Sequence, residues 1–64
     1  MERYKIVLYK QNPITYAKEK EKVLYFENEK DFKNAINKYF SLKSLHFFMA
    51  YELINDEYLL VASY

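Results

Sequence analysis

Few side chains in this sequence are of the types that carry out chemistry. His46 is the only histidine. Glu52 would share a strand face with it, but six residues of extended strand span about 20 Å at ~3.3 Å per residue, so the two cannot act as a pair within one strand. Ser63 would lie nearer to His46 across a hairpin, with no third group to complete a nucleophilic site. We therefore predict that the protein is not an enzyme.

Metal and cofactor sites lack their usual residues. Asp56 and Glu57 are adjacent carboxylates at a turn, and they offer too few oxygen ligands for a cation. The sequence contains no cysteine and no glycine. Disulfides, thiolate zinc sites and cysteine nucleophiles are thereby excluded, as are glycine-rich phosphate loops and dinucleotide fingerprints. We expect no metal and no cofactor.

The composition is that of one small folded domain spanning residues 1–64. Hydrophobic residues make up 52% of the sequence and the net charge is +1, which disfavours disorder. A domain this short buries only about 60% of its unfolded surface, so it needs large side chains or a partner for stability. The 8 Tyr and 5 Phe suit both needs.

Neither a targeting segment nor a membrane span is expected. The N-terminal MERYKIVLYK lacks a signal-peptide pattern, and the longest apolar runs are far shorter than a membrane helix. We expect a cytoplasmic protein with no membrane contact. Its abundant Lys, Asn, Ile, Tyr and Phe have AT-rich codons, which suggests a bacterial, phage or plasmid gene.

The first half of the chain predicts two strands. Polar and apolar residues alternate over Arg3 to Gln11, placing Tyr4, Ile6 and Leu8 on one face. A turn signal follows at Asn12-Pro13. The stretch from Ile14 to Lys22 fits an extended ribbon and a loop equally well, whereas the run from Val23 to Phe26 is a firmer strand.

The middle of the chain predicts a helix. Asn28 can cap its start, and Glu29 and Asp31 suit the first turn. The apolar stripe follows helical spacing and comprises Phe32, Ala35, Ile36, Tyr39 and Phe40. Without a glycine cap, we expect the helix to fray near residues 41–44.

The last third predicts a hairpin around a turn at Asn55-Asp56. A two-residue loop pairs Ile54 with Glu57 and Tyr51 with Leu60, and continues to pair Met49 with Ala62. This register makes one face of the hairpin apolar throughout, and we expect that face to lie under the helix. Its residues are Leu45, Phe47, Met49, Tyr51, Leu53, Tyr58, Leu60, Ala62 and Tyr64.

These elements predict an α+β fold of order β-β-α-β-β. It is a four-stranded, mainly antiparallel sheet with one helix packed on one face, and the sequence leaves the strand order open. The opposite face would then keep more apolar residues than solvent exposure explains. The predicted partner-binding residues on it are Val7, Tyr9, Tyr25, Phe48, Leu59 and Val61. The alternative is that the N-terminal loop or residues 14–17 fold over this face.

Three functions fit these sequence features. The first is a protein-binding module, a regulator or inhibitor of a larger protein, of phage or mobile-element origin. The second is a nucleic-acid-binding module in which Lys5, Lys18, Lys20 and Lys22 flank the sheet aromatics. Glu19 and Glu21 weaken this second interpretation because they interrupt the lysine run, and the pI of about 7.9 is low for such a module. The third is a subunit that forms a dimer or another homo-oligomer.

Overall fold

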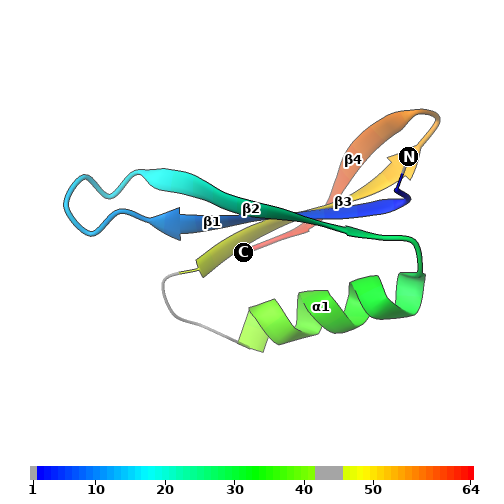
Figure 1. The fold of residues 1–64 in the computed structure, drawn as a ribbon, viewed down its shortest axis with the longest axis horizontal. Helices are drawn as coiled ribbons and strands as arrows, with labels where there is room; N and C mark the ends of the chain where they lie inside the picture. The colour runs from blue at the N-terminus through cyan, green and yellow to red at the C-terminus, as the bar shows by residue number, and fades with distance from the viewer. Residues whose placement is uncertain (1, 42–45) are drawn as a thin grey trace.

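The computed structural model describes residues 2–41 and 46–64, with the side chain of His46 excepted. Its elements run β1 (Tyr4–Gln11), β2 (Lys18–Phe26), α1 (Glu29–Ser41), β3 (His46–Ile54) and β4 (Glu57–Ser63). The strands form one antiparallel sheet of order β2-β1-β3-β4. Figure 1 shows α1 along one side of this sheet. The predicted α+β fold and element order are confirmed.

The core lies between α1 and the centre of the sheet. Buried side chains from β1 and β3 surround Phe32 of α1, whose ring stacks on Tyr4 with 4.4 Å between centroids. The rest of the predicted helix stripe packs around this centre, although Phe40 is still 47% exposed. The buried cluster comprises Tyr4, Ile6, Leu8, Phe32, Phe48 and Ala50.

The helix begins as the sequence predicts. The Asn28 side-chain oxygen accepts a hydrogen bond from the Lys30 backbone N–H at 2.7 Å, which satisfies one of the donors that a helix start leaves free. Lys33 and Glu29 form an ion pair one turn apart at 3.0 Å. The predicted fraying falls mainly on residues 42–44, which lie outside the described residues.

The charged stretch before Val23 is strand and not loop. β2 already begins at Lys18, and it pairs with β1 along its whole length. Its register shifts between Leu8 and Tyr9 of β1, so Glu21 is the extra residue of a bulge. Residues 12–17 connect the two strands at the far end of a projecting hairpin (Figure 1). The open choice between ribbon and loop is thus resolved in favour of the ribbon for Lys18 to Lys22.

β3 presents the opposite face to the helix from the one predicted. Phe48 is 1% exposed, Ala50 is fully buried, and both belong to the cluster under α1. Phe47, Met49 and Tyr51 therefore lie on the other side of the sheet, since side chains alternate along a strand.

Hydrophobicity alone favours the predicted face of β3, because the other alternate set contains His46 and Glu52. The prediction was wrong because only the middle of the strand, Phe48 and Ala50, is buried in the cluster under α1, so Glu52 need not be fully buried. Leu45, predicted on the same face as Phe47, lies outside the described residues. Ala50 and Ala62 pair under the helix, where small side chains let it approach the sheet.

A bulge in β4 corrects the predicted register beyond the middle of the hairpin. Ile54 pairs with Glu57 and Tyr51 with Leu60, as predicted. The register then shifts, so that Ala62 pairs with Ala50 and not with Met49. Val61 is the extra residue, and it lets Leu60 and Ala62 point to opposite faces. An alternating pattern alone would have kept them on the same face.

The turn at Asn55-Asp56 has the left-handed backbone that a two-residue hairpin requires. Asn55 has a φ of 52° and Asp56 a φ of 64°, and positive φ at both central residues defines the type I′ turn. Asn and Asp tolerate this region better than most residues, but glycine adopts it without a Cβ penalty.

Asp56→Gly should therefore stabilise the protein. We expect a gain of about 0.5 kcal/mol after the greater entropy of glycine in the unfolded chain is subtracted, or a rise of roughly 2–4 °C in Tm. The measurement is a thermal melt followed by far-UV circular dichroism. Asp56→Ala, which also removes the charge, should lower Tm instead. A higher Tm for the alanine variant would show that the charge, and not the backbone, governs this turn.

Candidate functional site

The sheet face opposite α1 is the candidate site, and we call it the open face. Within the described residues no element covers it: α1 packs on the other side and the β1–β2 hairpin projects away (Figure 1). The predicted alternative, that residues 14–17 fold over this face, is therefore wrong; Ile14 is 85% exposed at the hairpin tip. By register and alternation the open face holds Lys5, Val7, Tyr9, Gln11, Lys18, Lys20, Val23, Tyr25, Phe47, Met49, Tyr51, Leu53, Tyr58, Leu60 and Ser63.

Lys5 lies at the centre of this face between two tyrosines. Its Nζ is 4.9 Å from the ring centroid of Tyr51 and 4.3 Å from that of Tyr58, within the range of cation–π attraction. On the other side of Lys5, its cross-strand partner on β2 is Tyr25. Four strands thus bring one cation and three tyrosines together, and the lysine holds two of the rings in place.

The Tyr58 hydroxyl ties this cluster to the start of the chain. It donates a hydrogen bond to the backbone carbonyl of Glu2 at 2.6 Å. Partial removal from water raises the pKa of the Tyr58 hydroxyl, and the nearby Tyr25 and Glu2 add to the effect. Both effects extend to higher pH the range in which the hydroxyl remains a donor.

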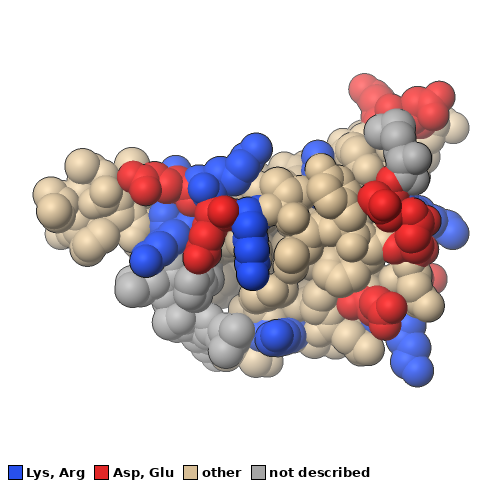
Figure 2. Space-filling model, viewed as in Figure 1, with Lys and Arg blue, Asp and Glu red and all other residues tan. Residues whose placement is uncertain are grey.

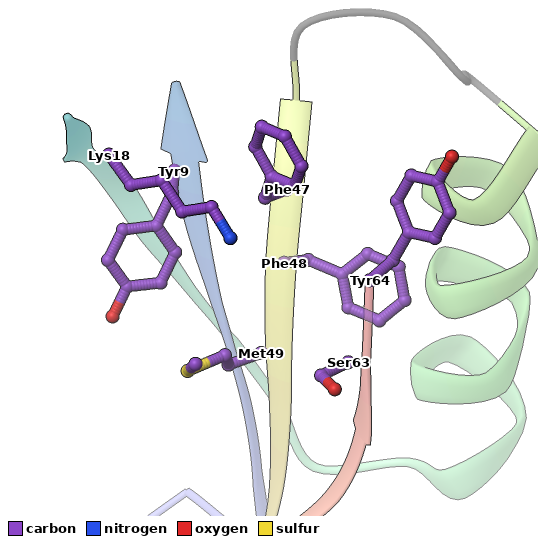
Figure 3. A pocket seen from close by; sticks show the side chains of 7 residues that line it. All are labelled: Tyr9, Lys18, Phe47, Phe48, Met49, Ser63 and Tyr64. Atoms are coloured by element: carbon purple, nitrogen blue, oxygen red, sulfur yellow. The ribbon is translucent and has the colours of Figure 1, made fainter. Parts of the chain in front are cut away.

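A hollow of about 250 Å³ opens at the other end of the sheet, beside the start of β3. Lys18 reaches across it with its Nζ 4.3 Å from the Phe47 ring centroid. Figure 3 shows Tyr9 and Lys18 on the side away from α1, while Phe48 and Tyr64 point toward the helix. Tyr64 closes the hollow by packing against both Phe47 and Phe40. The hollow is lined by Tyr9, Lys18, Phe47, Phe48, Met49, Ser63 and Tyr64.

The predicted partner-binding residues divide between the two faces. Tyr9 and Tyr25 lie on the open face, and Tyr25 is 55% exposed. Val7 lies there too but is buried, so it forms the floor beneath its neighbours. Phe48 is a correction: it packs in the core, against Phe40.

β4 supplies the other corrections. Leu59 pairs with Glu52. Glu52 is two residues from the buried Ala50 on β3, so both side chains lie on the helix side of the sheet and not on the open face. Val61 is the bulged residue at the sheet edge. Leu59 and Val61 are well exposed, but they belong to the edge and not to the open face.

Sequence reasoning missed Phe47, Met49, Tyr51 and Tyr58 as open-face residues. All four follow from the choice of face on β3, where the apolar pattern favours the wrong face. The structural reason for the choice is size, because an alanine opposite an alanine is better placed beneath a helix than at an aromatic surface. The sequence gives no signal for this pairing of Ala50 with Ala62, because it depends on the β4 bulge.

The four lysines of the nucleic-acid alternative also divide. Lys5, Lys18 and Lys20 take open-face positions, whereas Lys22 pairs with Leu8 on the helix side. Glu19, which interrupts the lysine run in sequence, pairs with Lys10 on the helix side as well. Apart from the bulged Glu21, the described strand positions of the open face therefore carry lysines and no carboxylate. Figure 2 shows acidic side chains at the end of the molecule that holds the β3–β4 turn, and others between the lysines of the β1–β2 hairpin.

The remaining sequence predictions concern catalysis and metal binding. The side chain of His46 lies outside the described residues, so its pairing with Glu52 or Ser63 stays untested. Within residues 2–41 and 46–64, no three side chains of the metal-binding types form a cluster. Over the same ranges, no helix is long and apolar enough to span a bilayer.

No family model, curated protein or solved structure matches this chain. The functional argument therefore rests on the open face itself.

Proposed function

We propose that this protein is a non-enzymatic binding module that docks on a larger protein through the open face, as a regulator or inhibitor. The observation that carries the proposal is a sheet face left uncovered by the described residues while it holds five aromatic residues. A solvated antiparallel face is ordinarily polar on alternate positions. Aromatic residues on such a face are the side chains that dominate binding energy at protein interfaces.

The charge on this face indicates the partner's chemistry. Lys5 and Lys18 lie over rings on the open face, and Lys20 is on the same side. A partner with acidic groups around an apolar centre would pair with all three lysines. We therefore propose an acidic, apolar docking surface on the partner.

The test compares two tyrosine variants of the same chemistry. Tyr25→Ser removes an exposed ring from the open face, whereas Tyr16→Ser removes one from the hairpin tip, where Tyr16 is also well exposed. After affinity capture of a partner from nuclease-treated host extract, calorimetry with the purified partner measures both. Tyr25→Ser should weaken binding by about 2 kcal/mol, or roughly 30-fold in Kd, and Tyr16→Ser should bind as the parent does. Equal binding by all three proteins would contradict the proposal.

A second candidate function is binding of single-stranded nucleic acid. The observation that favours it is the separation of charge by face, which puts three lysines among stacking rings. Against it, Lys5 and Lys18 already cover the faces of three rings, so bases would have to displace them.

Salt dependence distinguishes the two functions. Binding of a labelled single-stranded oligonucleotide would weaken with salt, by about 0.7 log units in affinity per log unit of salt for each lysine that contacts phosphate. Lys20→Ala should reduce that slope, and Lys22→Ala, on the same strand but the opposite face, should leave it unchanged. No measurable oligonucleotide affinity at low salt would remove this candidate.

A further inference from the structure

The two edges of the sheet differ in how they are protected. Because the order is β2-β1-β3-β4, β2 and β4 each have one side with no neighbouring strand among the described residues. The outer strand β2 carries the alternating charges of Lys18 to Lys22, and such charges guard an edge against pairing. β4 has a single charged residue, Glu57, followed by an apolar stretch. This edge has no such guard.

The side chains of β4 are exposed on both sides of the sheet. Leu60 is 54% exposed on the open face, and Leu59 is 45% exposed on the helix side. α1 leaves room there, because it packs mainly against β1, β2 and β3. An added strand could therefore bury apolar surface on both faces at once without meeting the helix.

The backbone of β4 is also free to pair. Phe48 and Tyr64 exchange both of their backbone hydrogen bonds, at 3.2 and 3.0 Å. In an antiparallel ladder the neighbouring residue then points its N–H and C=O the other way. Ser63 thus directs both groups out of the sheet.

We propose that β4 pairs with β4 of a second copy of this chain, antiparallel and about a two-fold axis, to give one eight-stranded sheet. Antiparallel self-pairing is complementary by symmetry and closes on itself. Tyr58 and Ser63 both lie on the open face. Both direct their backbone N–H and C=O groups outward, because Leu53, which faces Tyr58, bonds to Arg3 of β1 instead. The pairing that joins these groups sets Tyr58 of one copy opposite Ser63 of the other. The two Glu57 carboxylates then lie about 23 Å apart along the strands, at ~3.3 Å per residue, so the only charges on the edge do not oppose one another.

Other pairings fit less well. Joining β4 to β2 of another copy would place leucines beside the lysines and glutamates of β2, and it would leave free edges that extend into a filament. A single strand edge is smaller than the standard interface of roughly 1,200–2,000 Å², so the dimer is weak and reversible. In it, the two open faces join into one continuous surface and both helices lie on the opposite side.

The experiment is sedimentation velocity across protein concentrations from micromolar to near-millimolar. The parent protein should shift from 7.9 kDa toward twice that mass. Ser63→Pro, which removes an outward N–H, and Leu59→Lys, which places a charge on the edge, should both remain monomeric. Ile14→Lys makes the same change at the hairpin tip and should dimerise as the parent does. Circular dichroism confirms that each variant is folded.

Amide exchange of the parent protein tests the pairing without any variant. The Ser63 amide should exchange more slowly at high than at low concentration, while the outward amides of β2 are unaffected. A parent that stays monomeric, a folded Ser63→Pro protein that dimerises normally, or a Ser63 amide indifferent to concentration would each overturn the proposal. Loss of the dimer in Tyr25→Ser would also overturn the proposal, since Tyr25 lies on β2, at the opposite edge of the sheet from β4. The Tyr25→Ser variant tests docking of a partner, and the Ser63→Pro variant tests self-pairing. Either proposal can therefore be contradicted while the other holds.

Discussion

Phe48→Ala should lower the free energy of unfolding by about 3–5 kcal/mol, the cost of truncating a buried phenylalanine. Phe48 is 1% exposed and its ring meets Phe40 edge-on at 6.0 Å. No smaller side chain can fill the space between sheet and helix that this ring occupies. A 64-residue domain has a total stability of roughly 3–10 kcal/mol, so the variant should lose a third or more of it and unfold at a much lower urea concentration than the parent. Urea titration followed by far-UV circular dichroism measures the change.

Phe47→Ala is the matched control on the preceding residue of the same strand. Phe47 is half-buried on the open face, where Lys18 lies over its ring, and Tyr64 stacks beside it at the end of the sheet. We expect its truncation to cost about 1 kcal/mol, as for a partly exposed side chain. A larger loss for Phe47 than for Phe48 would show that β3 turns its other face to the helix, as the sequence pattern alone predicts.

The sequence predicts those elements in which polar and apolar residues are well separated. The helix is one: Phe32, Ala35 and Ile36 share one side, and Asn28 gives a clear start. β1 is another, because Tyr4, Ile6 and Leu8 alternate with more polar neighbours. In both cases burying the wrong face would put charged or amide groups into the core, and that energy difference makes the pattern decisive.

β3 and β4 do not follow this rule. On β3 the apolar pattern favours Phe47, Met49 and Tyr51 for the helix side, since the other set of alternate residues includes Glu52, yet the structure buries the other set. The choice of face is therefore made by packing. The observed face places Ala50 under the helix and allows Phe48 to fill the space beside it. A single bulged residue, Val61, then decides that Leu60 and not Ala62 faces the open side. Both choices depend on three-dimensional fit, which an alternating pattern does not encode.

The same dependence on packing governed the candidate site. An uncovered sheet face with Tyr9 and Tyr25 on it was predictable, because one helix covers only one side. The remaining aromatic residues were not, because they lie on β3 and β4. The correction nevertheless strengthens the case for binding. It replaces one phenylalanine, Phe48, with three aromatic residues, Phe47, Tyr51 and Tyr58, that surround lysines on the open face.

Ala50→Asp should be even more damaging than Phe48→Ala. Ala50 is fully buried, and among the described residues no basic side chain belongs to the cluster around it. A carboxyl group in such a place resists ionisation, and its pKa rises by about 3–5 units. Because Asp titrates near 4 in the unfolded chain, keeping the buried carboxyl protonated at pH 7 costs about 4 kcal/mol, at 1.36 kcal/mol per pH unit. Burying this polar group among apolar side chains costs more again, so we expect the protein to be largely unfolded. Met49→Asp introduces the same group on the partly exposed neighbour and should cost far less.

The pH dependence of this variant separates charge burial from mere misfit. A carboxyl whose pKa is higher in the folded than in the unfolded protein binds more protons when folded, so acid favours folding. The stability difference between Ala50→Asp and the parent should therefore shrink as the pH falls through the raised pKa toward about 4, the ordinary value for Asp. Denaturant titrations of both proteins in the same buffers between neutral and mildly acidic pH measure this difference. A penalty that is constant with pH would mean that the carboxylate reaches water, and that Ala50 does not lie beneath the helix.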